Sequence, residues 1–519
     1  MELKKESIKT SMEKGKAFSQ ITLEDDSIIP DSKPDVLKVV HTQGTIWFDE
    51  SKISNQALWI NGRMNFTVLY RSENEEKKLE SVTGSIPFQE KLVIDGIEEI
   101  DKIRIRGCFE DLGGSIINSR KLAIRSVVDI IAVAENETEE EIATGVMDGE
   151  HVEEKIGQEK LLQLMYNQKD VLRIRKEIEL PSAKPNIGEV LHWCISLKNV
   201  QTEPEQNKIL LRGDAGICVI YQSEGEEGLQ CFENVIPFEG TLDSTEFDPE
   251  EIYWICTQNV STELEAREDY DGEPRVFGME LSFDVTVKIW KEIQIPVLLD
   301  VYSLTQNLQP QKEYSTCEKL LIHNQAKVRL AEQFQLEKDQ EKMMQICCSF
   351  GELMTERMTL EEQGLYVEGV LKVHILYMTS DEFLPIAHEE AYIAVEQLVE
   401  IPPAENHIHY ELQSGIEQLN VNLMSSDSYE IKAQIFLDLI AFETVSFEKI
   451  TNLITLPFKK EEQNRQSGIV GYIAREGEEI WDIAKKYHTT VKRIMEMNDL
   501  QEDALSEGQK LLIVKEVYS

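Results

Sequence analysis

A 13-residue pattern occurs three times along the chain, and it constrains the fold more than any other feature of the sequence. It covers residues 58–70, 209–221 and 365–377. Both its fifth residue, a glycine, and its last residue, a tyrosine, are displaced by 151 residues from the first copy to the second, and by 156 from the second to the third. This shared displacement predicts tandem copies of one folding unit. The marker residues are Gly62 and Tyr70, Gly213 and Tyr221, and Gly369 and Tyr377.

Within each copy, apolar and polar residues alternate, which is typical of half-buried antiparallel strands. The run from Tyr429 to Phe442, for example, places Ile431, Ile435 and Leu439 on one side. A glycine inside such a strand indicates a bulge or the close approach of another backbone. We interpret the shared glycines as a requirement of sheet packing, and the shared tyrosines as aromatic residues at the edge of the core.

A second repeated element contains two prolines. Residues 30–39 and 181–190 share the pattern Pro-x-x-Lys-Pro-Asp/Asn, again displaced by 151, whereas the third copy has lost both prolines. Proline fixes φ and restricts the residue before it, so each segment is a stiff extended or turn element. Two interpretations stay open: a docking site for a partner, or a rigid entry into a strand.

The chain has 519 residues, enough for several domains with separate cores. We predict a mainly β protein: three tandem antiparallel β-sandwich-like repeats followed by a small βααβ domain. The spacing of Ile156, Leu161 and Met165 predicts a helical spacer over residues 153–165. The predicted boundaries are 1–150, 151–310 and 311–458 for the repeats, 459–468 for a linker and 469–519 for the last domain.

Charge and cysteine content limit the partners and the compartment. The chain has 53 Lys and Arg against 96 Asp and Glu, a formal net charge of −43, which argues against nucleic acid or an anionic membrane surface as a partner. Residues 1–18 do not resemble a secretory signal, and no apolar run is long enough to insert into a membrane. Eight cysteines without a C-x-x-C motif are expected to pack mostly as small hydrophobic residues, as Cys218 would, in a reducing cytoplasm.

No established catalytic motif occurs in the sequence, so we assign no catalytic residue and no cofactor, and predict that the protein is not an enzyme. The arrangement that most resembles a metal site is Glu405, His407, His409 and Glu411, which would share one face of a strand. Ligands spaced along one straight strand lie too far apart to bind a single ion. We therefore assign the polar row to solvent, the alternating face around Tyr410 to the core, and no metal site.

The last 45 or so residues predict a strand, two helices and a strand. Ile480, Ile483, Ala484 and Tyr487 form one apolar helical stripe, and Val491, Ile494 and Met497 form a second. Thr489 or Thr490 can cap the second helix, and Gly508 leads into a closing strand over residues 510–514. The order and spacing resemble the LysM domain at Tyr472, Gly477, Trp481, Ile483, Ala484, Tyr487, Asn498, Leu500, Gly508, Gln509, Leu511 and Ile513.

The LysM resemblance implies a shallow groove that binds N-acetylglucosamine chains. The groove residues that we predict are Gly477, Glu478, Glu479, Trp481, Asn498 and Leu500. The Gly-Asp-Thr of the family is replaced here by Gly477, Glu478 and Glu479, which removes a hydroxyl and adds a carboxylate. Because a neutral sugar is bound by hydrogen bonds and apolar stacking, the added anion gives it no advantage. Binding of a glycan and binding of a protein therefore both stay open.

The proline segments and the glycine–tyrosine cores, followed by one LysM-like domain, resemble the SipL-type spore morphogenetic proteins with their SPOCS domains. The resemblance implies a cytoplasmic protein of the mother cell, at the forespore surface, whose LysM domain contacts the coat-basement ATPase, stage IV sporulation protein A. Our hypothesis is a non-enzymatic scaffold of coat assembly. The alternatives are an accessory protein that binds peptidoglycan of the wall or cortex, and a wall hydrolase, which would need a catalytic signature.

Overall fold

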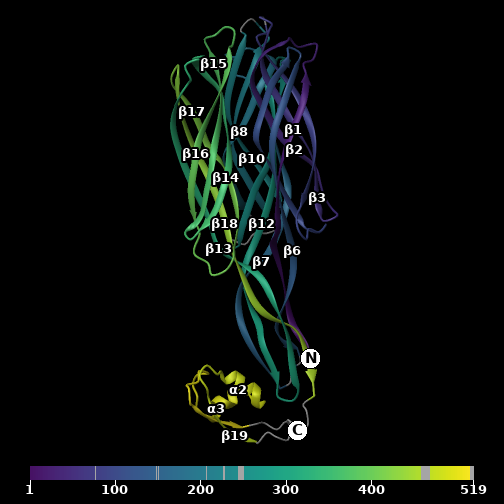
Figure 1. Cartoon of the computed structure of the whole chain (residues 1–519), viewed down its shortest axis with the longest axis vertical. Coiled ribbons are helices and arrows are strands. Elements are labelled where there is room, and N and C mark those ends of the chain that lie inside the picture. The colour runs from purple at the N-terminus through teal and green to yellow at the C-terminus, as the bar shows by residue number, and fades with distance from the viewer. Residues whose placement is uncertain are drawn as a thin grey trace.

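The computed structural model describes residues 1–75, 77–147, 149, 151–205, 207–225, 228–243, 251–457 and 468–514. Figure 1 shows an elongated molecule with β-rich lobes at one end, a narrower bundle of long strands below them, and a small helical domain at the other end. The predicted linker over residues 459–468 lies, except for Gly468, outside the described residues. In the part of the chain that the structure describes, no helix is long and apolar enough to cross a membrane.

The strands before the helical domain form three units of six, called repeats 1, 2 and 3. Repeat 1 contains β1 (Glu2–Ile28), β2 (Val36–Ser54), β3 (Ala57–Ser72), β4 (Leu79–Val93), β5 (Lys102–Asn118) and β6 (Lys121–Met147). Repeat 2 contains β7 (Val152–Glu179), β8 (Ile187–Glu205), β9 (Lys208–Ser223), β10 (Leu229–Asp243), β11 (Ile252–Glu268) and β12 (Pro274–Ser303). Repeat 3 contains β13 (Asn307–Gln335), β14 (Met343–Glu361), β15 (Gly364–Thr379), β16 (Ile386–Glu400), β17 (Ile408–Ser425) and β18 (Ser428–Leu456).

Each repeat is a sandwich of two three-stranded antiparallel sheets with the same topology. In repeat 1 the strand orders are β1-β6-β5 and β2-β3-β4, and the other two repeats follow the same order. The apolar side chains that alternate along the middle strands, such as Ile431, Ile435 and Leu439 of β18, are fully buried between the sheets. The prediction of three β-sandwich-like repeats is confirmed, because period-two alternation gives each sheet one apolar face that must be covered.

The first and last strands of each repeat extend beyond the sandwiches and form a stalk, seen in the lower half of the bundle in Figure 1. Ile8 and Ile142 from repeat 1, Leu161 from repeat 2 and Cys317 from repeat 3 share one apolar cluster there. The predicted helix over residues 153–165 is wrong, because this segment belongs to β7. In the stalk region both faces of β7 are covered by neighbouring strands, so its apolar residues do not follow a period of two.

The three shared glycines occupy equivalent positions, each opposite a register shift in the neighbouring strand. The shifts follow Phe48 in β2, Lys198 in β8 and Thr355 in β14. A Cβ atom on Gly62 would lie 2.4 Å from the Trp47 carbonyl oxygen, and one on Gly369 would lie 2.4 Å from the Met354 carbonyl oxygen. The predicted bulge and close backbone approach are therefore confirmed.

The shared tyrosines hold the turn that leads into each sandwich. Tyr70 and Tyr221 are fully buried and donate their hydroxyl hydrogen bonds to the carbonyl oxygens of Pro34 and Pro185, at 3.2 and 3.0 Å. Tyr377 makes the same bond, 3.1 Å long, to Glu341, which occupies the position of the lost proline. The proline segments thus serve as rigid strand entries, and the third copy keeps the turn without them.

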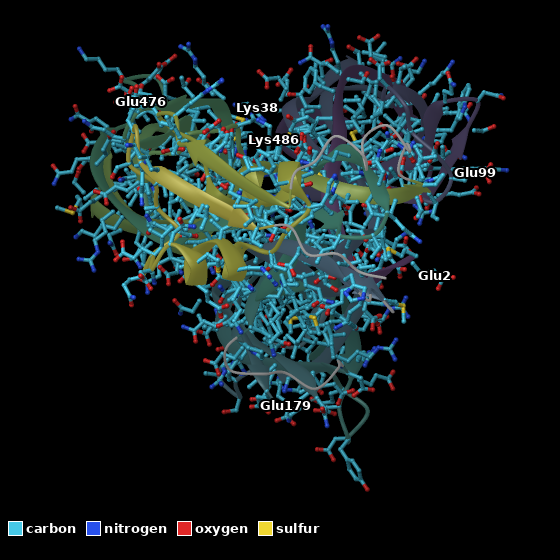
Figure 2. The ribbon with its side chains drawn as sticks, turned by 90° about the horizontal axis from the view of Figure 1, so that it is seen from below. Glu2, Lys38, Glu99, Glu179, Glu476 and Lys486 are labelled. Carbon is cyan, nitrogen blue, oxygen red and sulfur yellow. A yellow bond between two sulfur atoms is a disulfide. The ribbon has the colours of Figure 1, made fainter. Side chains whose placement is uncertain are left out.

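The three repeats pack side by side as three lobes, which Figure 2 shows from below. Leu69 of repeat 1, Ile220 of repeat 2 and Leu376 of repeat 3 meet in one buried cluster between the lobes. Two disulfides, Cys218–Cys348 and Cys231–Cys347, join repeats 2 and 3 in the same region. The expectation that Cys218 packs as a free hydrophobic residue is wrong, because its partner lies 130 residues away and is brought close only by the packing of the repeats.

Buried charges from all three repeats meet in a central ion cluster, which consists of Arg104, Glu135, Lys288 and Glu411. The ammonium group of Lys288 in repeat 2 lies 2.8 Å from a carboxylate oxygen of Glu135 in repeat 1 and 2.6 Å from one of Glu411 in repeat 3. Arg104 pairs with both of these carboxylates. Burial would raise the pKa of Glu411, but the charges of Lys288 and Arg104 outweigh it and lower the pKa to about 2.

The polar row from residue 405 to residue 411 is therefore only partly exposed, which corrects its assignment to solvent. Glu405 and His407 lie in an exposed loop before β17. His409 lies between Glu13 and Glu318, and although its burial lowers its pKa, hydrogen bonds to these carboxylates raise it to about 9. Glu411 belongs to the central ion cluster, so the four side chains have separate surroundings and do not converge on one point.

The bulge geometry predicts that an added methyl group lowers the free energy of unfolding at Gly62 more than at a glycine with open space around it. Gly62→Ala should lower the free energy of unfolding by about 2 kcal/mol or more, because the Cβ would overlap a backbone oxygen that cannot move freely. The matched control is Gly113→Ala in β5, where no described residue other than the chain neighbours has an atom within 4 Å of the added Cβ. Urea unfolding followed by circular dichroism compares the two variants, and equal midpoints would contradict the proposed role of the glycine.

The central ion cluster predicts a large effect of removing its buried cation. Lys288→Met should lower the free energy of unfolding by about 3–5 kcal/mol, since Glu135 and Glu411 lose a buried partner. Lys312→Met, which breaks the half-exposed pair with Glu448, should change it by less than about 0.5 kcal/mol.

The same cluster predicts acid sensitivity. Because folding lowers the pKa of Glu411, its stabilising contribution is complete above its ordinary pKa of 4.5 and is lost as the pH falls toward 2. Urea midpoints measured between pH 6 and 3 should therefore fall more steeply for the unmodified chain than for Lys288→Met. Parallel curves would show that Lys288 does not hold the charge of Glu411.

Candidate binding site

The helical domain at the end of the stalk, here called the terminal domain, carries the predicted groove. It comprises β19 (Ile469–Ile473), α2 (Ile480–Tyr487), α3 (Val491–Met497) and β20 (Lys510–Val514), and the two strands pair antiparallel. The predicted strand–helix–helix–strand order and the closing strand over residues 510–514 are confirmed.

Local signals explain both helices. Ile480, Ile483 and Ala484 of α2 are buried, and Ile494 of α3 packs with them. The hydroxyl oxygen of Thr490 accepts a hydrogen bond of 3.1 Å from the Arg493 N–H, the capping arrangement that was predicted for Thr489 or Thr490. Met497 is 45 % exposed and does not belong to the apolar stripe, because the short helix ends there and its last turn faces solvent.

The first loop of the groove is held by its own acidic residue. Gly477 has a φ of +78°, a conformation in which glycine carries no steric penalty. Glu478 follows it and accepts hydrogen bonds from the Arg475 N–H at 3.0 Å and the Tyr472 hydroxyl at 2.8 Å. These bonds, the backbone one first, lower the pKa of Glu478 and keep it ionised. The carboxylate thus shapes the loop and adds negative charge to its rim.

The second side of the predicted groove is internally bonded. Asn498 donates hydrogen bonds to the carbonyl oxygens of Ile494 and Leu512, at 2.7 and 2.9 Å, and its own oxygen accepts one from the Leu512 N–H. Leu500 is half-buried and packs against the core of the domain. Both residues join the end of α3 to β20, so their side chains are used in folding the domain.

Trp481 lies against repeat 2 and anchors the terminal domain to the stalk. Its indole N–H donates a 2.8 Å hydrogen bond to Asp300 of β12, and its ring meets Tyr302 edge-on with centroids 4.9 Å apart. Lys485 also bonds Asp300, at 2.6 Å, and the Tyr302 hydroxyl donates a bond of 2.8 Å to the Thr489 carbonyl oxygen. We call this the docking contact, and it consists of Asp300, Tyr302 and Trp481. Because Trp481 is bonded to repeat 2, its side chain is not available to a ligand.

Asp300 and Tyr302 are not among the functional residues that the sequence predicts. Both belong to a strand of repeat 2, far from the terminal domain in the sequence, and no motif marks them. Burial alone would raise the pKa of Asp300, but the bonds from Lys485 and Trp481 outweigh it and lower the pKa. An ionised Asp300 therefore receives both donors of the terminal domain.

Glu479 is the most exposed of the acidic groove residues and forms an ion pair with Lys155 of β7 at the edge of the docking contact. Of the six predicted groove residues, Gly477, Glu478 and Glu479 lie together on the first loop. The side chain of Trp481 contacts repeat 2. Asn498 and Leu500 hold the second loop, which is the segment between α3 and β20. Among the six predicted groove residues, those left for a ligand are accordingly acidic, and the aromatic ring that could stack on a sugar, that of Trp481, is held by repeat 2.

Two models of known protein families match the chain. The family model described as SipL, SPOCS domain matches residues 35–117, 186–265 and 342–424, which correspond to β2–β5, β8–β11 and β14–β17. The model described as LysM domain matches residues 472–514, the terminal domain. Comparisons with curated proteins and with solved structures gave no match.

The docking contact predicts that one carboxylate controls the position of the terminal domain. Asp300→Asn keeps the shape of the side chain but removes the charge that binds Lys485, so exchange of backbone amides with deuterium in α2 should become at least about 3-fold faster. Asp482→Asn, a change at an exposed residue of α2, is the matched control. Unchanged exchange in Asp300→Asn would show that the contact does not hold the domain.

Proposed function

Because the chain carries three SipL SPOCS domains followed by a LysM domain, we propose that it is a non-enzymatic scaffold in endospore coat assembly. Both domain types are non-catalytic binding domains. The observation that carries the proposal is this domain order, in which repeated lobes and a single terminal domain offer several attachment points on one chain. Linked weak contacts of this kind hold firmly on a multivalent surface, because each bound domain raises the local concentration of the next.

The proposed partner of the LysM domain is a coat-basement protein similar to the ATPase stage IV sporulation protein A. The acidic loop of Glu478 and Glu479 supports a protein ligand, since carboxylates recognise cationic side chains and contribute little to a neutral sugar. We propose that the partner contacts Gly477, Glu478 and Glu479, while Trp481 stays on Asp300. The distance of this loop from the three lobes leaves the lobes accessible to other coat components (Figure 1).

The proposed location is the mother-cell cytoplasm, at the forespore surface. In that reducing compartment the disulfides Cys218–Cys348 and Cys231–Cys347 of the structure would be reduced to free thiols. The contact between repeats 2 and 3 would then rest on the apolar cluster around Ile220 and Leu376 and on the central ion cluster.

A second candidate function is binding of peptidoglycan in the wall or cortex. The LysM match favours it, because a LysM domain supports binding of N-acetylglucosamine chains. The two candidates differ in their ligand but place it on the same domain, so one pair of variants distinguishes them.

A change in the charge of the acidic loop should affect the binding of a protein and the binding of a glycan in opposite ways. The double variant Glu478→Asp with Glu479→Thr restores the sugar-binding pattern of the family, whereas Glu479→Lys reverses one charge. If the partner is a protein, the unmodified chain binds the purified ATPase and does not sediment with peptidoglycan, and Glu479→Lys weakens the protein contact about 10-fold or more. Sedimentation and surface plasmon resonance measure both ligands.

The control for this experiment is Glu502→Lys, an exposed charge reversal on the second loop, for which protein binding should change little. Co-sedimentation of the unmodified chain with peptidoglycan, together with no measurable binding to the ATPase, would favour the second candidate and contradict the scaffold.

A further inference from the structure

Four histidines gather where the three repeats meet, and neither family match gives them a role. The histidine cluster consists of His41 on β2, His192 on β8, His374 on β15 and His388 on β16. His41 and His192 occupy equivalent positions, displaced by the repeat offset of 151, while the other two come from repeat 3. The cluster therefore depends on the packing of all three repeats.

The rings lie close enough for their nitrogens to share one ion. One possible ligand atom from each of His41, His374 and His388 lies within 4.8 Å of the other two. The Nδ1 of His374 lies 3.1 Å from the Nε2 of His388, and the ring centroids of His41 and His388 are 4.2 Å apart. Ligand nitrogens around tetrahedral zinc, at bond lengths of about 2.0–2.1 Å, are separated by about 3.3 Å. Small side-chain rotations would bring the three to that distance.

Two of the imidazoles have a buried nitrogen without a partner. His41 and His192 are 4 % and 2 % exposed, and among the described residues neither Nε2 atom has a hydrogen-bond partner. A buried polar atom left in this state destabilises the fold. A bound ion would remove this penalty at His41, whose ring lies against His388.

The environment keeps the imidazoles neutral, which is the form that binds metals. Burial is the main cause and lowers the pKa of His374 to about 3 and that of His388 to about 4, and it lowers the pKa of His41 well below its usual value. The charged groups around the cluster and its cavity are Lys372 and Glu390, which pair at 3.2 Å, together with Glu110, Asp111 and Glu352. Glu390 also lies 3.4 Å from the Nδ1 of His374.

A cavity of about 20 Å³ lies beside the cluster and has room for one water molecule; His41, His374 and Phe350 line part of it, whereas His388 does not. Neutral imidazoles suit late first-row divalent metals such as zinc, whereas magnesium and calcium prefer oxygen ligands. We propose that His41, His374 and His388 bind one divalent transition-metal ion of the zinc class, which fastens repeat 1 to repeat 3. The carboxylate of Glu390 lies beside the Nδ1 of His374 and would place a negative charge next to the ion.

The test uses the full chain, stripped of metal by a chelator, with zinc ions as the probe. Calorimetry should find about one zinc ion bound per chain, and bound zinc should raise the midpoint of thermal unfolding. His388→Gln and His41→Gln should each weaken binding more than about 10-fold. His407→Gln, which alters an exposed histidine outside the cluster, should leave it unchanged.

Cobalt substitution provides a measurement on the unmodified chain, which matters if a histidine variant fails to fold. Nitrogen ligation gives the visible bands of tetrahedral cobalt without a sulfur-to-metal charge-transfer band. The sulfurs of Cys194, Cys218 and Cys348 also lie within 4.8 Å of one another, so a charge-transfer band that disappears in Cys194→Ser would assign the ion to the cysteines and overturn the proposal. Zinc binding that is absent, or unchanged in both folded histidine variants, would overturn it as well.

Discussion

The burial of charge between the repeats is the constraint on which the rest of the structure depends. Lys288 is almost fully buried, and a buried ammonium group without partners is strongly destabilising. Its two carboxylate partners come from different repeats, so they reach it only when all three lobes adopt one relative arrangement. Any other arrangement leaves at least one of these charges unpaired, which makes the cluster a condition for the correct packing of the lobes.

This arrangement has consequences at both ends of the molecule. Toward the lobes, it brings together the apolar cluster around Ile220, the cysteines and the histidine cluster, all of which draw residues from more than one repeat. Toward the terminal domain, it aligns the long outer strands into one stalk, at whose end Asp300 and Tyr302 receive Trp481. The scaffold function that we propose uses this geometry, since it separates the LysM loop from the lobes by the length of the stalk.

The candidate site was predictable where its signals are local. The helices of the terminal domain follow from apolar spacing and from the cap at Thr490, and the loop of Gly477 and Glu478 follows from the LysM pattern. The role of Trp481 was not predictable, because its partner Asp300 belongs to another domain. The histidine cluster had one signal in the sequence, the offset of 151 between His41 and His192, but the two histidines of repeat 3 do not follow that offset.

The sequence by itself determined the three repeats, their strands, the glycine bulges and the terminal domain, because alternation, turn residues and caps act over a few neighbouring residues. Only the tertiary structure decided which strands cover both faces of β7, where Cys218 finds its partner and how Lys288 is neutralised. The disulfide of Cys218 and the ion pairs of Lys288 join residues more than 100 positions apart. Their energy comes from removing apolar and charged groups from water together, and no local pattern records which groups will meet.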